Sequence, residues 1–170
     1  MRQARQEDRA ASSWFERVFA EHYELVARYA LRRTGGWEDA ADVAAETLLI
    51  AWRRREQAPE GDAVRLWLYG IARRVVANHV RGGRRQEYLI ARLRSEPAPA
   101  AAADSGVNGT SDVLNRMKPG DREILILIAV EGLSPAEAAV VLGCSAVSVR
   151  VRLHRARARF AQMLSATDRT

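Results

Sequence analysis

Apolar residues recur along most of the chain at intervals of three and four positions, the spacing of one buried face of an α-helix. The pattern predicts helices over 14–33, 38–54, 63–81, 121–130, 135–142 and 146–163. No segment alternates apolar and polar residues in the manner of a half-buried strand. Residues 95–111 lack helical periodicity and are rich in Ala, Pro, Gly and Ser, which is typical of a flexible linker. The sequence therefore predicts an all-α fold with two small helical domains, 1–94 and 112–170, joined by that linker.

The most specific local signal lies in the second domain. Ser134 and Glu137 have the spacing of a capping box, and Pro135 occupies the first helical position. Gly143 follows the end of this helix, and Ser145 is placed to cap the next one. A helix, a short turn containing glycine and a second helix form the layout of a helix-turn-helix. The turn also holds Cys144, which is expected to pack between the two helices rather than to react.

The second helix of this motif divides into faces when residues are placed at about 100° intervals. The predicted buried stripe consists of Val149, Leu153, Ala156 and Phe160. The opposite face consists of Val147, Val151, His154, Arg155 and Ala158, with Arg150 and Arg157 on one flank and Arg152 and Arg159 on the other. Such a helix suits a DNA major groove, with arginines reaching phosphates and the centre reaching bases. The alternative is a surface helix whose arginines reflect a GC-rich genome.

The distribution of charge supports contact with a polyanion. The chain has 27 basic and 21 acidic residues, a formal charge of +6, and Lys118 as its one lysine. Eight arginines and one acid fall within 65–94, and five arginines and no acid within 150–159. A solvated surface usually mixes the two signs, so these stretches favour nucleic acid. Trp67 and Tyr69 interleave with arginines in a way that suits unpaired bases, although Trp67 also fits a core position.

A separate stretch, 38–46, carries four acids and no base. At helical spacing, a stripe of mostly acidic side chains runs along one side of the predicted helix. This stripe consists of Asp39, Asp42, Glu46, Leu49 and Arg53. It is either a docking surface for a basic partner or a solvated face. A catalytic role for its carboxylates would require a metal or a pocket, which the exposed side of a helix does not supply.

Several classes of function are disfavoured. One cysteine and three scattered histidines predict no metal site, and no cofactor is expected. No nucleophile-and-base arrangement or phosphate-binding glycine loop is present, so the sequence predicts no catalytic residues and no enzyme. The longest apolar run, 124–130, is far shorter than the roughly 20 residues of a membrane span. The first residues lack the apolar stretch of a secretory signal, so a cytoplasmic protein without membrane insertion is expected.

Three stretches together resemble bacterial RNA polymerase sigma factors of the sigma-70 family, in the compact extracytoplasmic-function (ECF) group. AADVAAETLLIAWRR (40–54) resembles the core-binding helix of region 2, and AVRLWLYGIARRVVANHVRGGRR (63–85) resembles its promoter-melting helix. MKPGDREILILIAVEGLSPAEAAVVLGCSAVSVRVRLHRARARF (117–160) resembles region 4, which reads the −35 element. The resemblance implies a transcription initiation factor with sigma region 2 in 1–94 and region 4 in 112–170. Its partners would be core polymerase, through the β′ coiled coil and β flap, double- and single-stranded promoter DNA, and an anti-sigma factor.

The resemblance also implies roles for individual residues. Polymerase binding falls on Asp39, Asp42, Glu46, Leu49 and Arg53. Recognition of the −10 element falls on Arg55, Gln57, Asp62, Arg65, Trp67, Arg73, Arg74 and Asn78, with the loop 55–62 capturing a flipped base. Recognition of the −35 element falls on Ser148, Arg150, Val151, Arg152, His154, Arg155 and Arg157.

The chain departs from the family pattern at three of these segments. Ala45 stands where Gln is common, Arg74 where Asn is common, and Val151 where Ser is common. Valine cannot hydrogen-bond a base edge but can pack on a thymine methyl group. The rival interpretation is an autonomous DNA-binding regulator that uses the helix-turn-helix without polymerase. That rival would tolerate charge reversal at Asp42 and Glu46.

Overall fold

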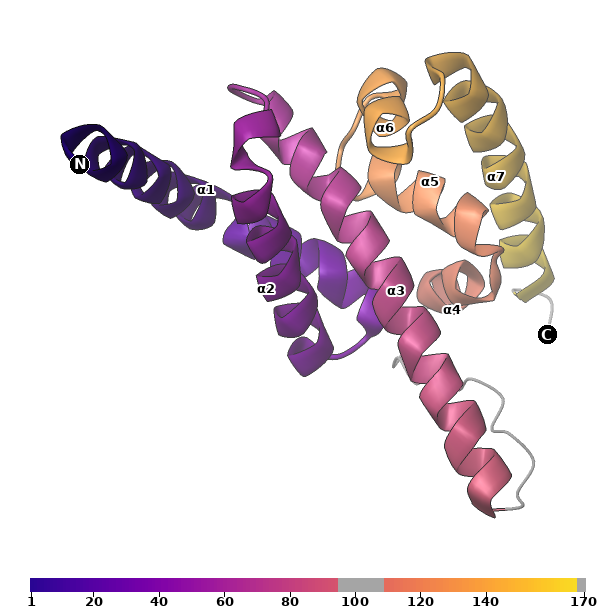
Figure 1. The fold of residues 1–170 in the computed structure, drawn as a ribbon. Coiled ribbons are helices and arrows are strands. Elements are labelled where there is room, and N and C mark those ends of the chain that lie inside the picture. Colours follow the sequence, from indigo (N-terminus) through magenta and orange to yellow (C-terminus); the bar gives the residue numbers. More distant parts are fainter. Residues whose placement is uncertain (95–108, 168–170) are drawn as a thin grey trace. The chain divides into compact units, whose positions relative to one another are not determined.

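The computed structural model describes residues 1–94 and 109–167, and all regular structure within them is helical (Figure 1). The chain divides into two units, Met1–Ala98 and Pro99–Thr170. The first unit contains α1 (Arg2–Thr34), α2 (Trp37–Arg53), the 3-10 helix η1 (Arg55–Gln57) and α3 (Ala63–Arg94). The second contains α4 (Gly109–Arg116), α5 (Pro119–Ala129), α6 (Pro135–Leu142) and α7 (Ala146–Thr167). The predicted all-α fold is confirmed. None of the described helices is long and apolar enough to span a membrane.

In the first unit, α1, α2 and α3 pack against one another around a common apolar core. The predicted buried positions of α2 and α3 are confirmed: Ala40, Ala44, Thr47, Leu48, Ala51, Val64, Leu68, Ile71, Ala72 and Val75. Tyr29 of α1 and Tyr69 of α3 meet at the centre, with ring centroids 5.0 Å apart. Tyr69 is only 2% exposed, so the expectation that it interleaves with arginines to stack bases is wrong. Its ring is part of the core instead.

Two helices of the first unit extend beyond their predicted limits. α1 begins at Arg2 rather than Trp14, and it ends where Gly35 adopts the left-handed conformation (φ 81°). α3 continues to Arg94 rather than ending at Arg81. Gly82 and Gly83 lower helix stability by about 1 kcal/mol each relative to alanine, but they do not block the helical hydrogen bonds. A glycine pair is therefore a weak stop signal inside an otherwise helix-forming sequence.

Most of the predicted linker, residues 95–108, lies outside the described residues. The last three linker positions, 109–111, belong instead to α4. Val113 of this helix is buried in the second unit, and Leu114 packs against its core. Two helical turns are too short to show a clear periodicity next to an Ala- and Pro-rich segment, which is why α4 was not predicted.

The second unit is assembled around α7, which packs against α4, α5 and α6. Its core cluster comprises Met117, Ile124, Leu125, Leu153 and Ala156, with Leu114, Ile128, Leu142, Phe160 and Met163 packed around it. The predicted buried stripe of α7 is confirmed: Val149, Leu153 and Ala156 are buried and Phe160 is half-buried. Because three helices hold one face of α7, its opposite face is presented to solvent.

The helix-turn-helix formed by α6 and α7 has the predicted caps, one at the start of α6 and one in the turn that follows it. Ser134 Oγ accepts a hydrogen bond from the Glu137 amide at 3.2 Å, and the Glu137 carboxylate accepts one from the Ser134 amide at 2.8 Å. Gly143 adopts the left-handed conformation (φ 67°), which lets the Cys144 amide donate to the Ala139 carbonyl at 3.1 Å. Half-buried Cys144 therefore lies within the turn, as expected.

The capping box predicts a measurable contribution to the second unit. Ser134→Ala removes the acceptor for the Glu137 amide and is expected to cost about 1 kcal/mol of unfolding free energy. Hydrogen exchange of the α6 and α7 amides, followed by NMR on the full chain, measures this change. Ser165→Ala is the matched control, because the Ser165 hydroxyl donates to the Ala161 carbonyl within α7 and alanine favours helix. Equal exchange in the Ser134→Ala and wild-type proteins would contradict the assignment.

Candidate protein and nucleic-acid interfaces

The acidic stripe lies on the exposed side of α2. All five of its members, Asp39, Asp42, Glu46, Leu49 and Arg53, are exposed, as the helical spacing predicted. They fall within about 80° of one another around the helix axis at 100° per residue. Neither Asp42 nor Glu46 forms an ion pair with another residue that the structure describes. Their carboxylates are therefore available to a basic partner.

The first residue of the acidic stripe, Asp39, contacts a side chain of α3. His79 Nε2 lies 3.0 Å from Asp39 Oδ1. Both side chains are partly exposed, so the contact forms at the surface where α2 and α3 meet. Asp39 thus already has a partner within its own unit, and the unpaired acidic character is concentrated at Asp42 and Glu46.

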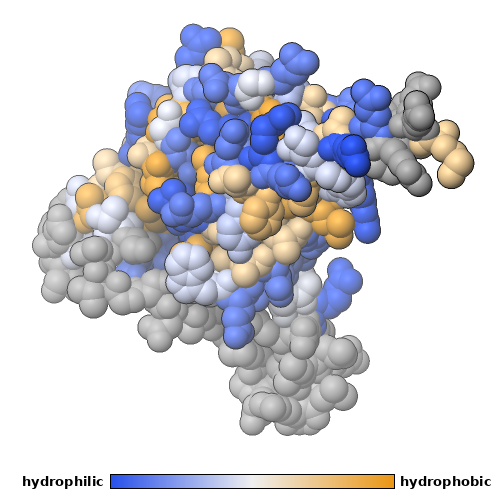
Figure 2. Space-filling view, turned by 90° about the vertical axis from the view of Figure 1, so that its left-hand side faces the viewer, coloured by the Kyte–Doolittle hydropathy of each residue, from blue (hydrophilic) through white to orange (hydrophobic). Residues whose placement is uncertain are grey.

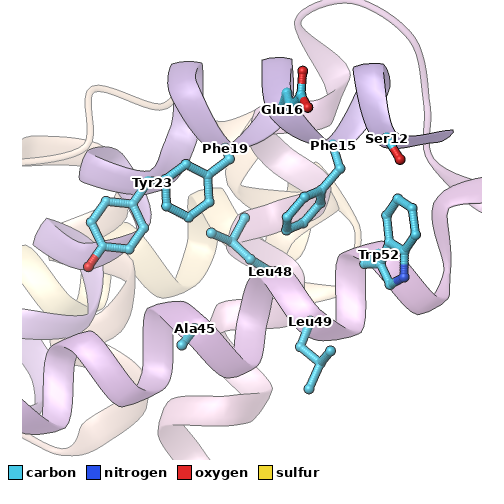
Figure 3. Close-up of a pocket in the computed structure, with 9 residues that line it drawn as sticks. All are labelled: Ser12, Phe15, Glu16, Phe19, Tyr23, Ala45, Leu48, Leu49 and Trp52. Carbon is cyan, nitrogen blue, oxygen red and sulfur yellow. The ribbon is translucent and has the colours of Figure 1, made fainter. Parts of the chain in front are cut away.

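An apolar groove runs beside the acidic stripe, between α1 and α2 (Figure 3). It encloses about 580 Å³ and is lined by Ser12, Phe15, Glu16, Phe19, Tyr23, Ala45, Leu48, Leu49 and Trp52. Three aromatic rings follow one another along α1, with Phe15 and Phe19 centroids 6.2 Å apart and Phe19 stacked on Tyr23 at 4.9 Å. Trp52 of α2 meets Phe15 edge-on at 5.4 Å. This arrangement forms a continuous aromatic wall along one side of the groove.

The groove and the acidic stripe share Leu49, whose side chain is 47% exposed. Phe19 of α1 is 45% exposed and adds to this apolar surface. Figure 2, which views the molecule from the side where α1 and α2 lie in Figure 1, shows apolar side chains gathered among charged ones. The sequence analysis missed this groove. The spacing of Phe15, Phe19 and Tyr23 at i, i+4 and i+8 was the available signal.

The predicted −10 residues on α3 divide between two faces. Half-buried Trp67 and exposed Arg74 and Asn78 fall within about 40° of one another on the helix, whereas Arg65 lies on the opposite side of α3 and Arg73 lies about 100° away from Arg74. Arg81, which the prediction omitted, joins the first face. Its guanidinium donates to Asn78 Oδ1 at 2.5 Å. The i+7 spacing from Arg74 was the signal that would have found it.

The loop that follows α2 presents its predicted residues unequally. Gln57 and Asp62 are exposed. Arg55 is half-buried: its guanidinium lies 4.7 Å from the Trp52 ring centroid and donates to the Trp52 carbonyl at 3.2 Å. Arg55 therefore anchors the loop to the end of α2, while Gln57 and Asp62 are accessible to a ligand.

The predicted −35 residues of α7 also divide between two sides. Arg150, Val151, His154, Arg155 and Arg157 are exposed, in agreement with the predicted opposite face and one flank. Ser148 is half-buried, and its amide donates to Ser145 Oγ at 3.2 Å, which caps the helix. Val147 and Ala158 complete the exposed face. The exposed face of α7 thus carries two valines and a histidine, with arginines beside them.

The second arginine flank of α7 lies beside α5 and makes contacts with it. Arg159 forms an ion pair with Asp121 at the start of α5. Half-buried Arg152 lies against the same helix, since a Cβ built on Gly120 would be 3.3 Å from Arg152 Nη2. Of the five arginines on this stretch, Arg152 is therefore partly covered by α5, while Arg159 is exposed and ion-paired to it. Among the described residues, no three His, Cys, Asp or Glu side chains are grouped so as to hold a metal ion.

Comparison with known proteins matches both units. Residues 18–86 match sigma-70 region 2, and residues 111–160 match sigma-70 region 4. The RNA polymerase sigma factor CnrH of Cupriavidus metallidurans is 30% identical over 92% of this chain and 91% of its own length. The chain belongs to the sigma-70 family, in its ECF group. The ECF RNA polymerase sigma factor SigL of Mycobacterium tuberculosis is 30% identical over 86% of this chain and 86% of its own length.

Solved structures of ECF sigma factors share the fold. CnrH in complex with the cytosolic domain of CnrY has a TM-score of 0.65 at 28% identity, over 94% of each chain. RpoE from Bartonella quintana, in complex with the anti-sigma factor NepR, has a TM-score of 0.68 at 24% identity, over 89% of this chain and 96% of RpoE. The predicted family is confirmed by the matches to regions 2 and 4 and by the identity to CnrH and SigL. A sigma factor is a transcription initiation factor rather than an enzyme.

Proposed function

We propose that this ECF sigma factor binds core RNA polymerase through α2 and directs it to promoters. In this proposal α7 reads the −35 element as duplex, and α3 with the loop 55–62 captures the melted −10 element. The observation that carries the proposal is that the two units present different surfaces. One presents an exposed acidic stripe beside an apolar groove, and the other presents a helix-turn-helix with an exposed basic helix. Catalysis would remain with the polymerase in the cytoplasm.

The polymerase surface is proposed to include the acidic stripe and the adjoining groove. Asp42 and Glu46 offer carboxylates without partners among the described residues, and Leu49 and Phe19 offer exposed apolar surface next to them. This combination suits an amphipathic helix with basic and apolar side chains, such as one arm of the β′ coiled coil. Apolar burial would supply affinity, while the carboxylates would set orientation. The β flap is the proposed contact of the second unit.

The −10 contact is proposed to follow the face of α3 that holds Trp67, Arg74, Asn78 and Arg81. A half-exposed indole can stack on an unpaired base, and the arginines can hold the strand's phosphates. The exposed side chains of Gln57 and Asp62 can hydrogen-bond the edge of a base turned out of the stack. Capture of unstacked bases needs no nucleotide hydrolysis by this chain.

An anti-sigma factor is the proposed regulatory partner. RpoE is seen in complex with the anti-sigma factor NepR, and CnrH in complex with the cytosolic domain of CnrY. A protein that covers the apolar groove or the exposed face of α7 would compete directly with polymerase or promoter DNA. The chemistry of both surfaces therefore suits inhibition by occlusion.

Run-off transcription tests the proposal. Purified bacterial core polymerase, with and without the protein, is offered genomic promoter fragments in the presence of labelled nucleotides. Initiation at discrete start sites that depends on the protein is the expected result, and alignment of those sites gives the −10 and −35 sequences. Duplex binding by the protein alone, with no protein-dependent start site, would overturn the proposal in favour of an autonomous DNA-binding regulator.

A further inference from the structure

Two valines stand exposed on the helix-turn-helix. Val147 is 63% exposed and Val151 is 45% exposed, and both belong to the first two turns of α7. They lie four residues apart and therefore on the same face, with Cβ atoms about 6 Å from one another. Large aliphatic side chains gain free energy when a partner removes them from water. The pair is thus an apolar spot of two isopropyl groups on the exposed, mostly polar face of α7.

The surroundings of the two valines favour DNA as the partner. Arg150 and Arg155 flank Val151, and both are exposed. Neither is opposed by a carboxylate of the same helix, because 146–167 contains no Asp or Glu. The N-terminal turns of the second helix in a helix-turn-helix are the part that reaches base edges in the major groove. The valines therefore occupy the base-reading position, with cations on either side for the phosphates.

Valine limits which base edge can be recognised. An isopropyl group neither donates nor accepts a hydrogen bond, so it cannot read adenine, guanine or cytosine by pairing with their polar edges. The one apolar group that unmodified DNA presents in the major groove is the 5-methyl of thymine. A valine facing a polar edge would instead leave that edge without a partner, which disfavours the other bases.

The spacing of the pair sets the spacing of the thymines. Four residues of helix advance about 6 Å, and successive base pairs rise about 3.4 Å. Two side chains at this separation span about two base-pair steps. We propose that Val147 and Val151 read the 5-methyl groups of two thymines that lie within three consecutive base pairs of the −35 element. The inference rests on the proposed function of α7.

Deoxyuridine substitution tests the inference at the level of one methyl group. In a promoter found by run-off transcription, each −35 thymine is replaced singly by deoxyuridine, which removes the methyl and keeps the hydrogen-bonding edge. The affinity of the wild-type holoenzyme is expected to fall about four-fold at two positions, the effect of losing one buried methyl. Those positions are expected to lie within three consecutive base pairs.

Serine variants then assign each thymine to a valine. Val147→Ser and Val151→Ser are each expected to abolish discrimination between thymine and deoxyuridine at one position and to keep it at the other. Val140→Ser is the matched control, because Val140 is equally exposed (64%) but belongs to α6. It is expected to keep both effects. Since all three side chains are exposed, the variants should fold as the wild type does.

Two outcomes would overturn the inference while leaving the proposed function intact. The first is protein-dependent initiation in which replacing any −35 thymine by deoxyuridine leaves the affinity of the holoenzyme unchanged. The second is discrimination that persists unchanged in both serine variants. If those variants instead lost binding to an anti-sigma factor and kept promoter affinity, the valines would be a protein contact. Complete absence of protein-dependent start sites would overturn the proposed function together with this inference.

Discussion

Reversing the charge at two positions of α2, Asp42→Arg with Glu46→Arg, is expected to weaken binding to core polymerase by at least about 100-fold. Each arginine would face the basic partner proposed for the acidic stripe, and juxtaposed like charges at an interface cost several kcal/mol. Both carboxylates are exposed and lack ion-pair partners among the described residues, so the fold should be retained. Fluorescence anisotropy of the labelled full chain against core polymerase, at fixed ionic strength, measures the loss.

The matched control reverses two acids on the other side of the same unit. Glu21 and Glu24 are exposed on α1 and fall on the face opposite Phe19, away from the groove. Glu21→Arg with Glu24→Arg makes the same change in net charge and is expected to bind polymerase as the wild type does. Wild-type affinity in the Asp42 and Glu46 variant would contradict the polymerase surface, and equal weakening in both variants would reduce it to a nonspecific charge effect.

Removing two arginines from α7 is expected to have the complementary result. Arg150→Ala with Arg155→Ala should leave polymerase binding unchanged and weaken the affinity of the holoenzyme for its promoter by about 30-fold or more. The slope of log affinity against log salt should fall by about one for each phosphate contact that is lost. A salt titration of promoter binding by the holoenzyme measures both quantities.

The control for this variant also removes two positive charges, but from α1 instead of α7. Arg17 and Arg28 are exposed on α1, on the face away from the groove. Arg17→Ala with Arg28→Ala is expected to keep the wild-type promoter affinity and salt slope. An unchanged slope in the Arg150 and Arg155 variant would show that these side chains do not contact phosphates. The Asp42 and Glu46 variant is thus expected to fail before assembly with polymerase, and the Arg150 and Arg155 variant after it.

Periodicity and capping residues were sufficient to predict the helix-turn-helix. Ser134, Glu137 and Gly143 act within a few residues of themselves, so their hydrogen bonds and backbone angles follow from local sequence. The buried stripes of α2, α3 and α7 were also correctly predicted, because each helix packs through one face. The exposed stripe of α2 followed from the same spacing.

The errors arose where tertiary contacts decide. Phe19 and Tyr69 are both aromatic residues on amphipathic helices, yet one is half exposed in a groove and the other is central to the core. Helical spacing places a residue on a face but does not say how deeply the neighbouring helix covers that face. The side chain of Arg152 is a similar case. Sequence placed it on the flank of α7, and only the position of Gly120 on α5 shows that it packs inward.

Arg152 and Arg159, which both contact α5, bear on how the rotation of α7 is fixed. Arg152 against Gly120 and the Arg159 ion pair with Asp121 hold α7 at two points, about two turns apart, on one neighbour. These two contacts add to the buried face of α7 in setting its rotation, so α5 contributes to the direction in which Val151 and Arg155 project. Under the proposed function, promoter preference is therefore encoded in part by residues that never reach the DNA. Substitution of Gly120 or Asp121 would change the direction of the exposed face of α7 without changing any residue proposed to contact a base.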